Sequence, residues 1–468
     1  MLNPNGKFRG FLRILKESVT GSERDFTQTS IRNAIILLSI PMVLEMLMES
    51  IFALVDIWFV SRLGNDPIAI VGFTESFMTI IYSVAVGLST ATTAVVSRRI
   101  GEKNREGASV AAFQAIAAAM AFSAVVSVPG IIYAKELLML MGVSEVSAEE
   151  YYGYTSIMLG SNCIIMLLFV MNAVFRSSGD AAVSMKVLLI ANGINIVLDP
   201  LLIFGYGPFP ELGIEGAAIA TVIGRGVGVA IQLWILFSGK KRVALVKNQL
   251  KIKWDILKEL VKLSTGGMAQ HLIATSSWIG MVWIIGNFGS AVMAGYTIAI
   301  RIIVFVILPA WGISNAASTL VGQNLGANQP GKAERSVWII GFVNSAVMGF
   351  IGLIIIVFSS QLMSFFTNDA AVISAGITAL TIISSGFVFY AFGMVMIQAF
   401  NGAGDTRTPT LVNIVCFWMM ELPLAWFLAM NQGFDEEGAY FAILISESFM
   451  TLLSIYLFRK GRWKLKKV

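Results

Sequence analysis

The stretch GLSTATTAVVSRRIGEKNREGA (87–108) decides the fold, because a second stretch, GISNAASTLVGQNLGANQPGKA (312–333), repeats its pattern without a gap. The aligned identities share an offset of 225 residues and include Gly87–Gly312, Ser89–Ser314 and Gly101–Gly326. The same offset relates SSGD, which ends at Asp180, to GAGD, which ends at Asp405. A constant offset of this kind indicates an internal duplication. We therefore expect two homologous halves.

The composition indicates a membrane protein. Of the 468 residues, 56% are hydrophobic and 13% are charged, and the mean hydropathy is +0.78. Soluble domains carry about 25% charged residues. The apolar residues form continuous runs that are long enough to cross a bilayer as helices. Because these runs do not alternate, a β-barrel is excluded and an all-α polytopic fold is expected.

The apolar runs predict twelve transmembrane helices in two pseudo-symmetric six-helix bundles around a central cleft. The predicted spans are 33–61, 67–97, 108–134, 149–175, 184–205, 213–238, 259–286, 292–321, 335–360, 371–400, 409–430 and 436–458. The predicted domains are an N-terminal segment (1–32), an N-lobe (33–238), a linker (239–258), a C-lobe (259–458) and a basic tail (459–468). Since six spans separate the two starts, the halves have parallel topology.

Basic residues predict the orientation. The loops 98–107 and 239–258 and the tail 459–468 are rich in Lys and Arg, whereas the opposite loops carry only Arg62 and Lys135. The positive-inside rule places both termini in the cytoplasm, for a multi-pass protein of the cell membrane. The net charge of +5 therefore reflects topology, and nucleic acid is not an expected partner. The first 30 residues do not resemble a cleavable signal peptide.

The sequence contains no motif of an ATP-driven pump or a common enzyme. There is no GxxxxGK[ST] element and no paired Cys/His cluster. The single histidine, His271, is interpreted as a packing or hydrogen-bonded residue. We therefore expect a secondary transporter and not an enzyme, with no cofactor besides a coupling ion.

An acid interrupts the apolar run NGINIVLDPLLIFGYG (192–207). Asp199 follows Asn195 by one helical turn, so the two side chains share a helix face. Carboxylates within a membrane are costly and usually mark functional sites. The alternative is a structural role, in which Asp199 bonds a backbone group that Pro200 leaves free.

The duplication provides an internal control for these acids. At the offset of 225, the corresponding pairs are Asp199–Leu424, Asn195–Met420 and Asp56–Met281. The second half therefore maintains its fold without acids at these positions. This contrast favours a functional role for the acids of the first half.

The first span carries a stripe of acids. Glu45, Glu49 and Asp56 are spaced by four and seven residues, so they lie on one helix face. Such a stripe is untenable against lipid and must face a cavity or partner helices. Pro41 precedes the stripe and is a candidate hinge. For Glu45 the alternative is a water-facing position near the cytoplasmic end of the helix.

These residues suggest an ion site. A buried carboxylate binds and releases a proton or, when ionised, coordinates Na⁺ together with amide and hydroxyl oxygens. Asn195 provides an amide, and Thr221 on the sixth span is a candidate hydroxyl, although a membrane threonine often bonds its own backbone instead.

Glu49 is a candidate substrate contact. It lies two turns from Asp56 and deeper in the predicted cleft, with Asn172 of the fourth span as an expected neighbour. A carboxylate there would attract a cationic substrate in a low-dielectric cavity. The alternative is that Glu49 stays protonated and bonds a neighbouring helix.

The chain resembles the MATE (multidrug and toxic compound extrusion) transporters. The likeness covers essentially all twelve spans and rests on segment 41–56, on the NIVLDP, GAAIAT and GAGDTRTP boxes, and on the two stretches quoted first. The DinF-like prokaryotic branch is most similar, because no acid falls within 260–287, where another branch carries one.

The resemblance implies an antiporter that exports organic, often cationic, compounds in exchange for H⁺ or Na⁺. It also implies that Asp56, Asn195, Asp199 and Thr221 form the cation site. Glu49 departs from the family pattern, which has a neutral polar residue there. The expected partners are small organic substrates and membrane lipids, and a monomer is expected.

Two other functions remain as alternatives. One is a lipid-linked sugar flippase of the same superfamily, although such proteins have a strongly basic cleft, and the only arginines well inside the predicted spans are Arg225 and Arg301. The other is an intramembrane aspartyl enzyme that uses Asp56 and Asp199 as an acid pair.

Overall fold

The structure is a computed structural model that describes residues 4–21, 24–246 and 250–468, with side chains from residue 10 onward. The helices before the central linker are α1 (Pro4–Thr20), α2 (Ile31–Val60), α3 (Asn65–Gly101), α4 (Arg105–Ile132), α5 (Ala134–Leu140), α6 (Glu145–Gly160), α7 (Asn162–Ser178), α8 (Ala181–Ile203) and α9 (Gly213–Phe237). We call α2–α9 the first half.

The second half runs from α10 to α18. It contains α10 (Trp254–Ile285), α11 (Ser290–Gly326), α12 (Pro330–Val357), α13 (Ser359–Phe366), α14 (Ala370–Ser385), α15 (Phe387–Gly402), α16 (Arg407–Asn413), the π-helix η4 (Ile414–Glu421), α17 (Leu422–Trp426), the π-helix η5 (Phe427–Asn431) and α18 (Asp435–Arg459). Short 3₁₀ turns are η1 (Ser61–Leu63), η3 (Gly286–Phe288) and η6 (Arg462–Leu465).

The expected all-α polytopic fold is confirmed. Within the described residues, eleven helices are long and apolar enough to cross a membrane, and α14 and α15 form one further span bent by 53°. The span predicted at 371–400 is therefore broken, at Gly386. Large apolar side chains such as Val125, Phe350 and Leu353 are exposed on the outer surface, as expected for contact with lipid rather than water.

The duplication seen in the sequence is also a duplication of backbone shape. Gly64 separates α2 from α3 with φ +111°, and Gly289 separates α10 from α11 with φ +99°, one offset of 225 later. Both angles lie in the region that side chains with a Cβ rarely adopt. Each half thus turns from its first long helix into its second through a glycine in the same conformation.

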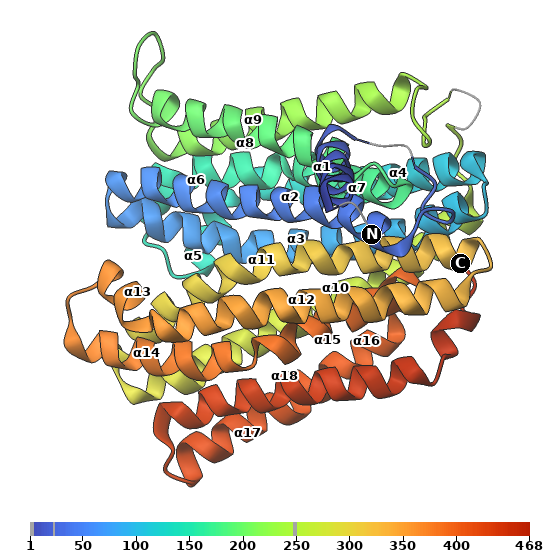
Figure 1. The fold of residues 1–468 in the computed structure, drawn as a ribbon. Coiled ribbons are helices and arrows are strands. Elements are labelled where there is room, and N and C mark those ends of the chain that lie inside the picture. The colour runs from blue at the N-terminus through green and yellow to red at the C-terminus, as the bar shows by residue number, and fades with distance from the viewer. Residues whose placement is uncertain (1–3, 22–23, 247–249) are drawn as a thin grey trace.

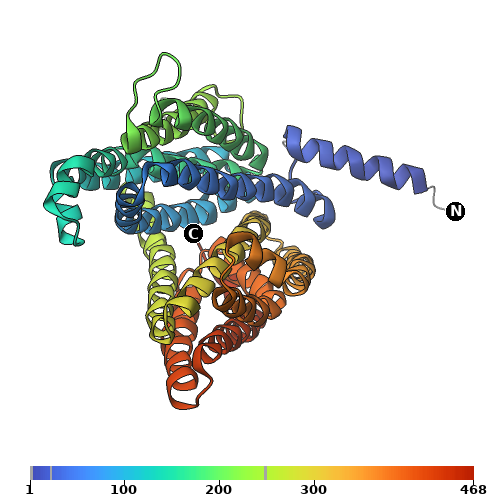
Figure 2. The same cartoon turned by 90° about the vertical axis from the view of Figure 1, so that its left-hand side faces the viewer.

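The helices gather into two groups. Figure 1 shows them running side by side, with the C-terminus and the α9–α10 connection at one end of the bundle. We call this end the terminal face. In the turned view, most of α2–α9 lies on one side and most of α11–α18 on the other, while α10 packs along α3 (Figure 2).

The repeated stretches meet where the two halves pack. A Cβ on Gly87 of α3 would lie 2.5 Å from the carbonyl oxygen of Ser264 in α10, and one on Gly312 of α11 would lie 2.6 Å from that of Met42 in α2. Further along the same helices, Gly101 and Gly326 also lie too close to the other half for a side chain. These glycines permit close backbone approach on the terminal half of the bundle.

Two features lie outside the expected boundaries. Residues 4–20, expected to form a polar segment, form the helix α1, which projects away from the bundle (Figure 2). Its Phe11, Leu12 and Val19 side chains are exposed. The helix α10 begins at Trp254, inside the segment 239–258 that was predicted as linker.

Candidate cation and substrate site

A cavity of about 850 Å³ lies between the two halves. On the first half its wall comes from α2, α3, α7, α8 and α9, and on the second half from α10, α11 and α15. The second half contributes four aromatic side chains to the wall, Trp278, Tyr296, Phe305 and Trp311. Beyond the last cavity residues of α3 and α11, Thr93 and Thr319, the two halves pack closely at Gly101 and Gly326.

Three of the four predicted cation-site residues are joined by hydrogen bonds. Asn195 Nδ2 of α8 donates to Asp199 Oδ1 at 3.2 Å and to Thr221 Oγ1 of α9 at 3.1 Å. All three side chains are buried, and Asp199 is fully so. Asn195 Oδ1 and Asp199 Oδ2 have no hydrogen-bond partner in the structure. Two buried oxygens are thus available to a proton or a cation.

The fourth residue, Asp56 of α2, lines the cavity in front of this cluster. No hydrogen bond joins it to Asp199 among the described residues, but the two carboxylates are close enough for their charges to interact. The structural alternative for Asp199, a bond to the backbone near Pro200, is not seen. Asp199 Oδ1 instead accepts from Asn195, and Oδ2 is free.

Glu49 has a partner that the sequence did not predict. Its Oε2 lies 3.5 Å from Nη2 of Arg225 in α9. Arg225 also lies over the Phe52 ring, at 5.1 Å from the centroid, and hydrogen-bonds Tyr82 of α3. The guanidinium therefore crosslinks three helices of the first half. Glu49 and Arg225 both line the cavity.

The water-facing alternative for Glu45 is wrong. Its side chain is fully buried, and its Oε1 accepts from Arg176 Nη1 of α7 at 2.7 Å. Arg176 was missed as an intramembrane cation because the fourth span was expected to end at residue 175, whereas α7 continues to Ser178. A buried carboxylate and a guanidinium thus neutralise each other at the end of the cavity that lies nearer the terminal face.

No side-chain hydrogen bond joins Asn172 or Pro41 to the acid stripe in the part of the chain that the structure describes. Asn172 lines the cavity, but its Oδ1 accepts from Gln232 of α9 at 2.6 Å, and no bond from it to Glu49 is present among the described residues. Pro41 lies within α2, which is helical from Ile31 to Val60.

Two charged residues of the cavity wall were not predicted as site residues: Glu75 was not singled out, and Arg301 was named only as an arginine inside a span. Glu75 of α3 and Arg301 of α11 come from opposite halves and interact electrostatically. At the offset of 225 they correspond to Ile300 and Ser76, so the comparison of the halves that singled out Asp56 would have found them as well. The same comparison would have found Glu421 and Glu447, which lie inside the last two predicted spans.

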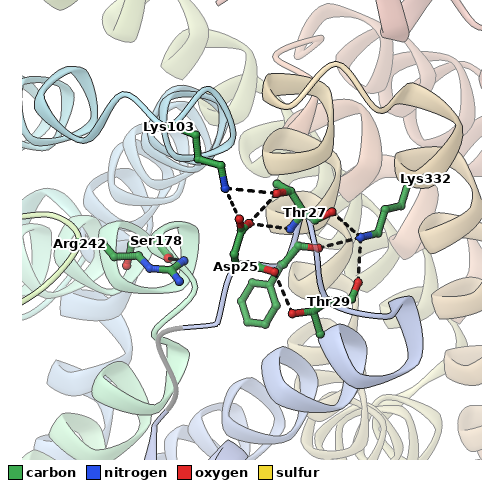
Figure 3. A network of polar contacts seen from close by, with 8 residues as sticks. Asp25, Thr27, Thr29, Lys103, Ser178, Arg242 and Lys332 are labelled. Carbon is green, nitrogen blue, oxygen red and sulfur yellow. Dashed lines mark hydrogen bonds and ion pairs between the residues drawn. The ribbon is translucent and has the colours of Figure 1, made fainter.

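At the terminal face, residues 24–30 form a strap between the halves. Figure 3 shows Asp25 paired with Lys103 of the α3–α4 loop, and Lys332 of α12 donating to the carbonyl oxygens of Phe26, Thr27 and Thr29 at 3.1, 2.8 and 2.8 Å. Burial opposes ionisation of Asp25, but its contacts with Lys103 and Thr27 prevail and hold its pKa below the usual value.

The C-terminal tail also bridges the halves at this face. Lys466 Nζ lies 3.0 Å from Asp405 of the second half, while its carbonyl oxygen accepts from Arg98 of α3 at 2.7 Å. Lys464 pairs with Glu334 of α12 at 2.5 Å, and Trp463 is fully buried. We call the strap and this tail together the terminal clasp.

The donor set suits a small hard cation or a proton better than a transition metal. No group of three or more His, Cys, Asp or Glu side chains is placed to hold a metal ion in the part of the chain that the structure describes. A site at Asp199 would use carboxylate, amide and hydroxyl oxygens, which are ligands of hard cations.

Comparison with known proteins identifies the fold and relatives. The family model MatE matches residues 41–201 and 268–427. The probable multidrug resistance protein NorM of Thermotoga maritima is 27% identical over 449 residues, covering 94% of each chain. The multidrug export protein MepA of Staphylococcus aureus is 23% identical and covers 93% of this chain and 95% of its own.

One further relative and a solved structure extend the comparison. The FAD transporter of Shewanella oneidensis is 25% identical and covers 87% of this chain and 89% of its own. A solved MATE transporter in an outward-facing conformation superposes with a TM-score of 0.88 at 24% identity, covering 94% of this chain and 98% of its own. The relatives are of NorM and MepA type, and assignment to the DinF-like branch stays a prediction.

Proposed function

This chain belongs to the MatE family of membrane transporters, and we propose that it is a multidrug exporter driven by the entry of H⁺ or Na⁺. The observation that carries the proposal is the buried cluster of Asn195, Asp199 and Thr221, which lies behind Asp56 on the wall of a cavity shared by both halves. A transporter needs such a place, where an ion can bind next to the substrate path. The chain is not an enzyme.

Coupling rests on the two free oxygens of the cluster. Either a proton on Asp199 Oδ2 or a Na⁺ ion between this oxygen and Asn195 Oδ1 would remove the penalty of a buried, unpaired carboxylate. Occupation of the site changes the charge beside Asp56. Because Asp56 lines the cavity, this change is felt where a substrate binds.

The cavity wall favours amphiphilic organic cations. Trp278 and Trp311 on the second half offer flat apolar faces, and cations bind over such rings. On the first half Asp56 supplies a carboxylate without an ion pair among the described residues. The relatives named for multidrug resistance support this class of substrate.

Arginine pairing argues against the lipid-linked sugar alternative. Arg176 and Arg225 are engaged by Glu45 and Glu49, so their charges are offset within the first half. Arg301 is the remaining cavity arginine, and it interacts with Glu75 across the cavity. Recognition of a pyrophosphate needs several uncompensated cations.

We further propose alternating access by two rocking lobes, the N-lobe (33–238) and the C-lobe (259–458). The terminal face is cytoplasmic in this scheme, since its loops carry the excess of Lys and Arg. In this scheme the close packing of the two halves at that face corresponds to an outward-facing state. Opening inward requires the glycine contacts and the terminal clasp to separate.

Flux measurements in proteoliposomes test the function. Protein is reconstituted, a pH or Na⁺ gradient is imposed in separate experiments, and transport of a fluorescent organic cation is followed. Gradient-driven transport by wild type that is lost in Asp199→Asn supports the proposal. Transport that needs no gradient, or that is equal in Asp199→Asn, contradicts it.

A further inference from the structure

Two carboxylates of the second half are buried away from the site described above. Glu421 ends the π-helix η4 and Glu447 lies in α18, with exposed fractions of 6% and 5%. Ser277 of α10 donates to Glu421 Oε1 at 3.2 Å, and Tyr390 of α15 hydrogen-bonds Glu447. The other oxygen of Glu447, Oε2, is buried without any hydrogen-bond partner.

Within residues 4–21, 24–246 and 250–468, no cation offsets these two acids. The titratable groups that face them are Tyr296 of α11, Tyr390 of α15 and Cys416 of η4, and the carboxylates also face each other. Among the described residues, no Lys, Arg or His forms an ion pair with either Glu421 or Glu447. Two ionised carboxylates would repel each other here without compensation, so the pair holds at least one proton.

The pair lies one side chain behind the cavity wall. Trp278 and Tyr296 line the cavity, and Ser277, which precedes Trp278, donates to Glu421. Tyr296 is itself within electrostatic range of Glu421. Hydroxyl groups therefore stand between Glu421 and the cavity, and chains of hydroxyl groups and water can carry protons.

The repeat gives this location a counterpart in the first half. Gly216 at the start of α9 and Gly438 at the start of α18 each pack against the backbone of the preceding span. Aligned on these two glycines, at an offset of 222 in this helix instead of the 225 found earlier in the chain, Arg225 and Glu447 occupy the same position, nine residues further on. The two halves thus place a buried charged residue of opposite sign at the same point of their last helix. In the first half this residue pairs with an acid of the cavity wall.

We propose that Glu421 and Glu447 form a second proton-binding site, located in the second half, that exchanges protons with the cavity during transport. Release breaks one carboxyl O–H bond, leaves one carboxylate and delivers the proton to cavity water. Because the remaining proton is then held by the adjacent negative charge, the pair cycles one proton rather than two. This inference rests on the proposed transport function, but its test does not require flux.

Infrared spectroscopy of the purified full-length protein provides the test. The absorption of protonated buried carboxyl groups is recorded while the pH is stepped from acidic to alkaline. We expect one titrating carboxyl band of the wild type to be lost in Glu421→Gln and in Glu447→Gln, while the bands of Asp56 and Asp199 remain. Glu437→Gln, an exposed acid in the first turn of α18, is the matched control and should equal wild type.

Two outcomes would overturn the site. If both Gln variants keep the full titrating signal, the titrating protons are bound elsewhere. If the signal that the variants lose does not titrate in wild type, the pair is a permanently neutral structural contact. Glu447→Asp, which keeps the carboxyl group, covers the case in which Glu447→Gln fails to fold. Failure of the transport proposal is separate, because Asp199→Asn would then leave gradient-driven flux unchanged while the Glu421–Glu447 signal still titrated.

Discussion

Glu49 Oε2 lies 3.5 Å from Arg225 Nη2, so the acid least expected from the sequence is paired within its own half. The pair is partly open to the cavity, since a quarter of the Glu49 side chain is exposed. A cationic substrate that binds near Glu49 competes with Arg225. This competition makes the affinity sensitive to the balance between the two charges.

Removing the charge of Glu49 should weaken the binding of cations. In Glu49→Gln, Arg225 loses its partner and adds positive charge to the cavity. We expect about a tenfold weaker binding of a cationic dye in detergent at neutral pH, or about 1.4 kcal/mol. Binding of a neutral compound should be unchanged. Equal dye affinities in the variant and wild type would rule out this role.

Removing either acid of the ion site should abolish coupling. Asp56→Asn and Asp199→Asn keep the side-chain shape but cannot ionise, so we expect at least a tenfold loss of gradient-driven export with normal membrane insertion. Met281→Leu, at the duplicate position of Asp56, serves as the control and should transport normally. Wild-type efflux in either Asn variant would remove the basis for the site.

The hydrogen bond from Asn195 to Thr221 should hold the Asn195 amide in the position in which it binds the ion. Thr221→Val keeps the shape and deletes the acceptor 3.1 Å from Asn195 Nδ2. We expect a severalfold rise in the ion concentration that gives half-maximal transport, with little change in the maximal rate. A variant with the wild-type ion dependence would show that Thr221 only packs.

Substitutions of Glu45 and Arg176, which form a buried ion pair, should have non-additive effects on the free energy of unfolding. Arg176→Gln leaves a fully buried carboxylate without its cation, which costs about 3–5 kcal/mol. The thermal unfolding temperature should therefore fall clearly. In Glu45→Gln/Arg176→Gln much of the loss should be recovered, and strictly additive effects would contradict the pairing.

The strap should stabilise closure of the terminal face at neutral pH. Because its contacts lower the pKa of Asp25, their stabilising effect is present above the usual value and is lost as the pH falls through the lowered value. Asp25→Asn mimics that loss at neutral pH. We expect faster thiol labelling, from the terminal face, of a cysteine placed at the cavity residue Asn315.

Two controls belong to that experiment. Asp369→Asn changes an acid that caps α14 and should not alter labelling. Asn65 and Ser290 both lie at the end of the bundle that is opposite the terminal face. Cysteines placed near them should crosslink only when the cavity is closed at that end. An unchanged labelling rate in Asp25→Asn would contradict the role of the strap. Crosslinking in both the outward and the inward state would contradict rocking lobes.

Local patterns in the sequence predicted much of the fold. Runs of apolar residues located the spans to within a few residues, and the shared face of Asn195 and Asp199 follows from helical geometry alone. The pairing of Glu49 with Arg225 did not follow, because it depends on how two distant helices are rotated. Arg176 was not predicted because the expected span ended one residue before it. Glu421 and Glu447 were not predicted because the two halves were compared only at the acids of the first half.

The terminal clasp lies largely outside the duplicated parts of the chain. The strap precedes α2 and the tail follows α18, so neither has a counterpart in the other half. Substitutions there can shift the resting balance between outward and inward states while the ion site and the cavity keep their shapes. Relatives with the same transport core can therefore differ in turnover through their chain ends alone.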